Sequence, residues 1–172
     1  MKKLAFVLLA CASALAQAQA PAAPSQEQML QMQQMMARQM QVMAAMYDLR
    51  YARQGVNETV AAIRAAAEKR GWKLGDVVDM QAQMRQSGAK EARPMKVVHL
   101  CPRDANERVA KASGGKAPPL ACRATVCEGK DGKTNVVRLN LHTLAKGMQG
   151  ELSKVLGELA AEEDALYKGI LE

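Results

Sequence analysis

The sequence predicts an α+β domain, with an antiparallel sheet covered by helices on one face and one amphipathic helix in front of it. Two observations predict this class. Short segments with apolar residues at alternate positions, typical of strands, recur between residues 47 and 141. Segments with helical periodicity precede, interrupt and follow them. The resulting order is a leading helix over 26–46, then strand, helix, four strands, helix, which is typical of an antiparallel sheet with its helices on one face.

The first 18 residues predict export. Met1-Lys2-Lys3 is a charged n-region, Leu4 to Leu15 is a short apolar h-region, and Ala16-Gln17-Ala18 fits a signal-peptidase site. The apolar run is shorter than the roughly 20 residues that span a membrane. We therefore expect cleavage after Ala18 and a periplasmic or secreted protein. In the alternative, Leu8-Leu9-Ala10-Cys11 is a lipobox and Cys11 carries a lipid, which is the one case in which we expect a membrane partner.

The charge balance does not favour nucleic-acid binding. The 172 residues carry a net charge of +7, which falls to +5 once residues 1–18, with two lysines and no acids, are removed. Aromatic residues make up only 3% of the chain. No basic and aromatic residues cluster in the way that stacks bases. We therefore expect no nucleic-acid partner.

A Pro/Ala linker over residues 19–25 leads to the helix over 26–46, which is rich in methionine. At about 100° per residue its seven methionines fall in one arc of about 140°. They are Met29, Met32, Met35, Met36, Met40, Met43 and Met46. Such a pliable apolar stripe is typical of a surface that docks a helix, a membrane or an unfolded partner. The residues we expect to make that interaction are Met29, Met32, Met36, Met40 and Met43. In the alternative, thioether sulfurs three residues apart bind Cu(I).

Alternation, turn residues and helical periodicity predict the remaining elements. A strand over 47–53 leads through Gln54-Gly55 to a helix over 58–70, with Asn57 as its N-cap and Gly71 just past its end. The later elements are a weakly alternating strand over 76–84, a strand over 95–101, a short helix over 103–113, strands over 120–127 and 134–141, and a helix over 143–171. Three glycines at 147, 150 and 157 weaken the last helix.

Three cysteines remain after signal cleavage, Cys101, Cys122 and Cys127. In an oxidising compartment an odd number predicts one disulfide and a leftover thiol, or a set of ligands. If the strands that Cys101 ends and Cys122 opens are neighbours, facing Cα atoms about 4.5–5.5 Å apart suit a disulfide. A redox-active pair and a metal site are the open alternatives.

The candidate metal site is His99, Cys101 and Cys122. His99 shares a strand face with Cys101, and a His-x-Cys pair supplies two ligands to copper or zinc. Cys122 would be the third ligand, and Met148 or a helix methionine the fourth. Copper is the cofactor that this set favours. In the alternative, His99 is a partly buried strand residue with a backbone partner.

Six short segments between residues 47 and 171 together form a recognisable pattern. They are Asn57-Glu58-Thr59-Val60, Lys69-Arg70-Gly71-Trp72, Val98-His99-Leu100-Cys101, Pro119-Leu120-Ala121-Cys122-Arg123, Gly129-Lys130-Asp131-Gly132-Lys133 and Arg138-Leu139-Asn140. In these segments, residues 47–171 resemble the domain of unknown function 302 family. The resemblance implies a TATA-binding-protein-like strand order and a homodimer, and it implies no established activity. The chain departs from the family pattern at Pro102-Arg103, at Ala121 and at Cys127.

No catalytic motif is present: the sequence lacks Gly-x-Ser-x-Gly, His-Glu-x-x-His, a dinucleotide fingerprint and a phosphate loop. We interpret Glu162, Glu163 and Asp164 as a solvated helix face. We therefore expect a non-enzymatic, exported binding or accessory domain that handles Cu(I) or another soft metal. The competing class is a protein-interaction or dimerisation module with a structural disulfide. A third is a thiol-dependent redox protein, which needs Cys101 or Cys122 exposed with a depressed pKa.

Overall fold

The computed structural model describes residues 25–172. The predicted signal peptide, Cys11 and all of the linker except Ser25 lie outside the described residues. Helix α1 (Gln26–Ala45) begins with a capping box, in which the Gln28 amide donates to the Ser25 hydroxyl and the Ser25 amide donates to the Gln28 side chain. No residue of α1 is buried. Within residues 25–172, no helix is both long enough and apolar enough to cross a membrane.

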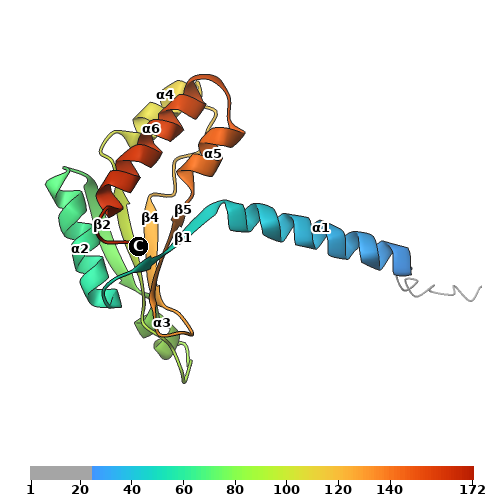
Figure 1. Ribbon diagram of the computed structural model, residues 1–172, viewed down its shortest axis with the longest axis horizontal. Coiled ribbons are helices and arrows are strands. Elements are labelled where there is room, and N and C mark those ends of the chain that lie inside the picture. The colour runs from blue at the N-terminus through green and yellow to red at the C-terminus, as the bar shows by residue number, and fades with distance from the viewer. Residues whose placement is uncertain (1–24) are drawn as a thin grey trace, which may run out of the picture. The chain divides into compact units, whose positions relative to one another are not determined.

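Five antiparallel strands form one sheet in the order β1-β5-β4-β3-β2 (Figure 1). They are β1 (Tyr47–Ala52), β2 (Lys73–Asp79), β3 (Met95–Cys101), β4 (Arg123–Glu128) and β5 (Thr134–Leu139). The α+β class and the strand, helix, four strands, helix order predicted from the sequence are confirmed.

Apolar side chains that alternate along the strands build the main core on one face of the sheet, which we call the inner face. The inner face includes Val98 and Leu100 of β3, Ala124 and Val126 of β4, and Val136 of β5. Helix α2 (Val56–Lys69) and the end of α6 (Gly150–Tyr167) pack on it through buried Ile63, Leu166 and Tyr167. Burial of these side chains is the main stabilising contribution to the fold.

A second apolar cluster lies where three helices meet at one end of the domain, around buried Val109, Leu141 and Leu159 (Figure 1). The helices are α4 (Ala105–Ala112), α5 (Leu141–Gly147) and the first part of α6. Cys101 and Leu139, at the ends of β3 and β5, pack against this cluster. The cluster therefore covers the end of the sheet at which Cys101 lies.

The opposite face of the sheet, which we call the open face, carries a largely apolar row of side chains that belongs to neither cluster. Residues paired in register continue this row across all five strands. It consists of Leu49, Val137, Thr125, Val97 and Val78. Leu49 is 55% exposed and the other four are half-buried. Among the described residues, no core cluster includes them.

Three sequence predictions need correction. The strand expected over 76–84 is the end of β2 followed by helix α3 (Met80–Gln86), whose N-cap is Asp79. Helix α2 begins at Val56 with Gly55 as N-cap, so Asn57 is not the cap. The helix expected over 143–171 is two helices, broken where Gly150 takes a φ of +65°, a conformation that glycine adopts without strain.

Candidate functional site

The predicted disulfide is present and joins Cys101 to Cys122. Cys101 is the last residue of β3, and Cys122 immediately precedes β4, the strand beside it. The Leu100 amide donates to the Cys122 carbonyl, which holds the two segments in register and the two Cα atoms 5.0 Å apart. The bridge closes a loop with a sequence separation of 21. A loop of this length predicts a stabilisation of about 3 kcal/mol, chiefly by restricting the unfolded chain.

The disulfide lies beside a pocket of about 10 Å³, lined by Cys122 and by apolar residues such as Leu139, Leu141 and Leu159. One ionisable side chain, that of Glu163, also lines this pocket. A volume of this size corresponds to about one water molecule. The pocket is therefore too small for an organic substrate.

His99 is exposed on the face of β3 that lies opposite the inner face. Its ring Nδ1 lies 3.1 Å from the Asp76 carbonyl oxygen, at an irregularity of β2 beside Gly75. A Cβ atom at position 75 would lie 3.0 Å from the Cβ of His99, which explains the glycine. His99 therefore has the backbone partner that the non-metal alternative expected, although it is exposed and not partly buried.

The pairing of β3 with β4 brings the proposed metal ligands close in space. His99 lies two residues before Cys101 and pairs in register with Arg123, which follows Cys122. The sulfur atoms of Cys101 and Cys122 are bonded to each other in the disulfide, however. Within residues 25–172, no group of three or more His, Cys, Asp or Glu side chains is arranged to hold a metal ion. Ligation by Cys101 and Cys122 therefore requires reduction of the disulfide first.

Arg138, on β5, organises a buried ionic cluster that sequence reasoning missed. Its side chain is 9% exposed and donates to carboxylates from two elements. The partners are Asp48 of β1 at 2.9 Å, and Glu163 and Asp164 of α6 at 3.2 and 2.9 Å. The guanidinium also stacks on the Tyr167 ring, 4.7 Å from its centroid. The cluster therefore ties the edge strand and α6 to β5.

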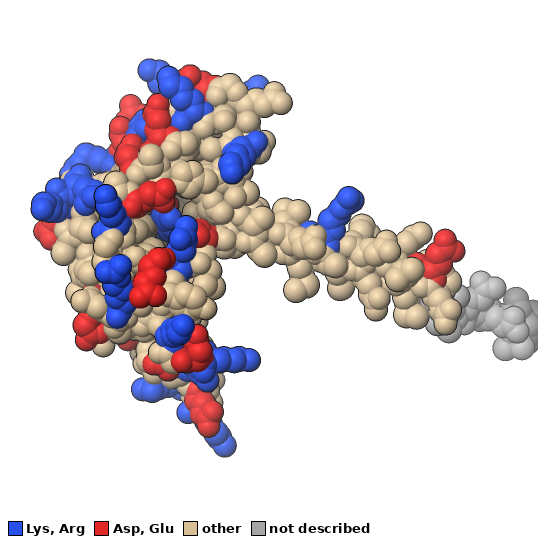
Figure 2. All heavy atoms as spheres, in the orientation of Figure 1, with Lys and Arg blue, Asp and Glu red and all other residues tan. Residues whose placement is uncertain are grey.

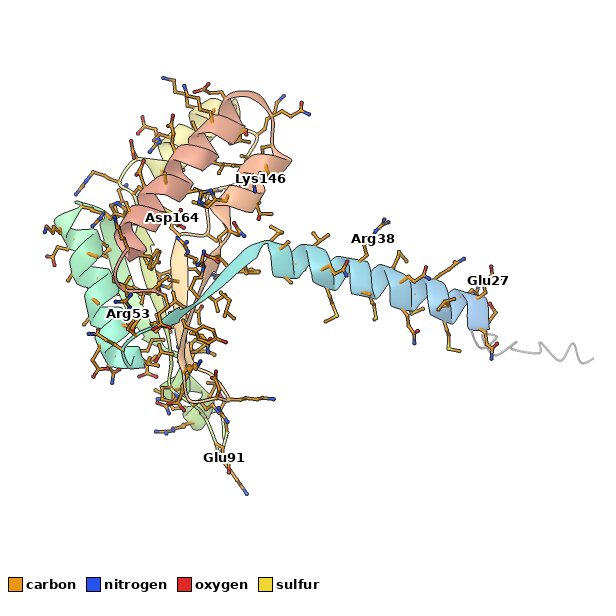
Figure 3. All side chains as sticks on the ribbon, in the orientation of Figure 1. Glu27, Arg38, Arg53, Glu91, Lys146 and Asp164 are labelled. Carbon is orange, nitrogen blue, oxygen red and sulfur yellow. A yellow bond between two sulfur atoms is a disulfide. The ribbon has the colours of Figure 1, made fainter. Side chains whose placement is uncertain are left out.

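His142 of α5 extends this cluster, because its Nε2 lies 2.7 Å from an Asp164 carboxylate oxygen (Asp164 is labelled in Figure 3). Burial alone would raise the pKa of Asp164, but the hydrogen bonds from His142 and Arg138 hold it below the usual value. Burial raises the pKa of Glu163 to about 7 despite the charge of Arg138. Burial and the Glu163 charge also raise the pKa of the Tyr167 hydroxyl. The cluster thus contains one acid with a lowered pKa, Asp164, and one that titrates near neutral pH, Glu163.

The interpretation of Glu162, Glu163 and Asp164 as a solvated helix face is wrong for Glu163, whose side chain is 21% exposed. Glu162 accepts a 2.6 Å hydrogen bond from Arg108 of α4. A signal for the buried cluster was present in the sequence. Alternation along β5 places Arg138 on the same face as Val136, and a cation on a core face needs anionic partners.

The methionine stripe of α1 is exposed along its length. Six of its methionines, Met29, Met32, Met35, Met36, Met40 and Met43, are 48% to 72% exposed. Figure 2 shows the helix almost free of charge, and Figure 3 labels its two charged residues, Glu27 and Arg38. An apolar stripe of this length in water is typical of a surface that contacts another molecule.

Comparisons with known proteins bear on residues 47–170. This segment matches the model of a family whose description is domain of unknown function DUF302. The crystal structure of an uncharacterized conserved DUF302 protein from Bacillus stearothermophilus has a similar fold, with a TM-score of 0.59 and 16% identity. The match covers 72% of this chain and 96% of that one. No curated protein matches the sequence. At this identity the likeness shows the fold and no function.

Proposed function

Because this chain belongs to the DUF302 family, whose domain is of unknown function, we propose a role that uses the segment lying in front of the domain. The protein is a non-enzymatic, exported interaction module that associates with another protein through the methionine stripe of α1. The exposure of six methionines on one helix, with no buried residue among its twenty, is the observation that carries this proposal.

The position of the stripe supports the proposal. Helix α1 ends at Ala45, before the family match begins at residue 47, so the stripe is an addition to the family domain. Methionine side chains are flexible and polarizable, and they adapt to partner surfaces of varied shape. Association would remove the stripe from water and thereby gain the free energy of apolar burial.

The disulfide supports the exported part of the proposal. Disulfides persist in secreted and periplasmic proteins, whereas reducing systems keep cytosolic thiols reduced. The Cys101–Cys122 bridge therefore fits the export signal predicted over residues 1–18. It gives the exported domain a covalent brace and leaves the stripe as the interacting surface.

In-cell photo-crosslinking tests the proposal. A photoreactive amino acid at position 36, inside the stripe, should form adducts with a protein, whereas the same group at position 34, on the polar side of α1, should form few. Changing Met29, Met32, Met36, Met40 and Met43 to Gln should abolish adducts from a probe at position 35 and preserve the helix, because Gln and Met have similar helix propensities. Equal adducts from positions 34 and 36 would refute the proposal.

The exposed sulfurs also favour a second candidate, the binding of Cu(I) by thioether pairs such as Met29 and Met32. Native mass spectrometry of the protein loaded with Cu(I) should show retained copper that the five-residue Met→Gln variant loses. Ligation by His99, Cys101 and Cys122, and likewise a thiol-dependent redox role, requires the reduced protein. Copper retained only after disulfide reduction, and lost in the His99→Ala variant, would assign that site in place of the stripe.

A further inference from the structure

We propose that the partner of α1 is a second copy of this chain, and that its methionine stripe lies on the open face of that copy's sheet. The two copies exchange helices reciprocally and form a closed dimer. This inference rests on the proposed function and names its partner and the receiving surface. It joins two apolar surfaces, the exposed methionine stripe of α1 and the apolar row of the open face, which belongs to neither core cluster.

The receiving surface is continuous across the sheet. The apolar row of the open face, from Leu49 on β1 to Val78 on β2, crosses all five strands. A second row beside it is formed by Tyr51, Asn135, Cys127 and Met95, also paired in register. Neither row contains a charged side chain, and the methionine stripe contains none. The nearest cations on this face are Arg123, paired with His99 in the next row, and Lys133, whose Nζ lies 4.9 Å from the centroid of the Tyr51 ring. The side chains of Arg123, His99 and Lys133 are exposed, so they can stay in water at the rim of the docked helix, where they avoid the cost of a buried unpaired charge.

The connection between α1 and β1 favours a second copy over the same chain. Only Met46 separates Ala45 from Tyr47. The Met46 amide donates to the Val42 and Met43 carbonyls, and its carbonyl accepts a hydrogen bond from the Asn140 amide. A connection of one residue with both backbone groups held is a short hinge, and short hinges favour exchange of a segment between copies over its return onto the same chain.

The size of the contact is sufficient for a stable dimer. A helix of 20 residues is about 30 Å long and 10–12 Å across, whereas five strands about 4.8 Å apart span roughly 24 Å. The sheet can therefore contact roughly 400 Å² of one side of the helix. Two helix faces and the two sheet surfaces under them then bury roughly 1,600 Å², the standard size of a specific interface. Each chain supplies one helix and one open face, so the exchange closes after two copies.

Cys127 provides a native probe, because it lies on the central strand in the second row and its thiol is free. The full chain is purified with its disulfide intact in two variants, Met36→Cys in the stripe and Gln34→Cys on the polar side of α1. A short bismaleimide then links thiols irreversibly, and mixed light and heavy isotope labelling separates links between copies from links within one copy. The Met36→Cys/Cys127→Ser variant is the control for linkage to Cys127, and sedimentation velocity measures whether the unlinked protein is a monomer or a dimer.

We expect Met36→Cys to give a covalent dimer linked from position 36 to Cys127 of the other copy, at least about tenfold more abundant than from Gln34→Cys. The dimer link should disappear in Met36→Cys/Cys127→Ser. A link within one chain, a dimer without any link to Cys127, or a monomer by sedimentation would each overturn the inference. If the chain is monomeric and photo-adducts from position 36 with another protein persist, the inference fails while the proposed function stands.

Discussion

The inner face of the sheet and the open face contrast within a single layer of strands. On the inner face, Val98, Val126 and Val136 are fully buried, and Arg138 is saturated with carboxylates. On the open face, Leu49 is 55% exposed and no helix of the described chain contributes to a core over it. Successive side chains of the same strands point to the two faces in turn, so the composition of the strands alone does not show which face is covered.

The difference indicates a division of roles. Substitutions on the inner face should change the free energy of unfolding, because they alter packing and buried charge. Substitutions on the open face should change association and leave the folded domain nearly as stable. The four predictions that follow test this division, in order of decreasing expected effect on stability.

The largest effect should come from Arg138→Met, which leaves the carboxylates of Asp48 and Glu163 without their buried cation. We expect a loss of about 3–5 kcal/mol in the free energy of unfolding at pH 8, measured by urea denaturation. The matched control is Arg108→Met. Arg108 also pairs with three carboxylates, those of Asp104, Glu158 and Glu162. Its side chain is 24% exposed, however, so we expect a loss of about 1 kcal/mol or less. Equal losses in the two variants would contradict a special role for the inner-face cluster.

Removal of the disulfide should have the next largest effect. In the double variant Cys101→Ser/Cys122→Ser, the free energy of unfolding should be lower by about 3 kcal/mol, because the unfolded chain regains the conformational entropy that the closed loop removes. Chemical denaturation with and without a thiol reductant measures the same quantity in the unmodified protein. A reduced protein as stable as the oxidised one would mean that the bridge does not brace the domain. Cys127→Ser is the control for the loss of a thiol.

Glu163 should make stability depend on pH. Its folded-state pKa is raised from the ordinary 4.5 to about 7, so the folded state holds this proton more tightly than the unfolded state does. The stability that this provides is complete below about pH 4.5 and is lost as the pH rises through 7. We expect a decrease of about 3 kcal/mol over that window, and Glu163→Gln should abolish this part of the slope. Denaturant titrations at closely spaced pH values measure it, and an unchanged slope in Glu163→Gln would disprove it.

The smallest effect on stability should come from Leu49→Gln, on the open face. Because this side chain is mostly in water, the free energy of unfolding of the domain should change by no more than about 0.5 kcal/mol. Under the proposed exchange dimer, the same substitution should weaken self-association at least about tenfold by sedimentation equilibrium. A large loss of stability with unchanged association would reverse the roles assigned to the two faces.

Local patterns predicted much of this fold and part of the candidate site. Alternation in β3 and β5, helical periodicity in α2 and the arc of methionines in α1 each depend on residues a few positions apart. The Cys101–Cys122 pairing was predictable once two neighbouring strands were assumed. The weak alternation near residues 76–84 was misleading, because the Asp79 side chain caps α3 through the Ala82 amide and ends the strand there.

By itself, then, the sequence determined the α+β class, the order of the strands along the chain and the amphipathic helix in front of the domain. It left Cys101 and Cys122 with a disulfide and a metal site as alternatives, and the structure shows the disulfide. Only the tertiary structure decided which acids surround Arg138. Its partners Asp48 and Asp164 lie 90 and 26 positions away along the chain, and their approach depends on how β1 and α6 pack against β5. The tertiary structure also decided which face of the sheet is open. Alternation shows that a strand has two faces, but the helices decide which of them is covered.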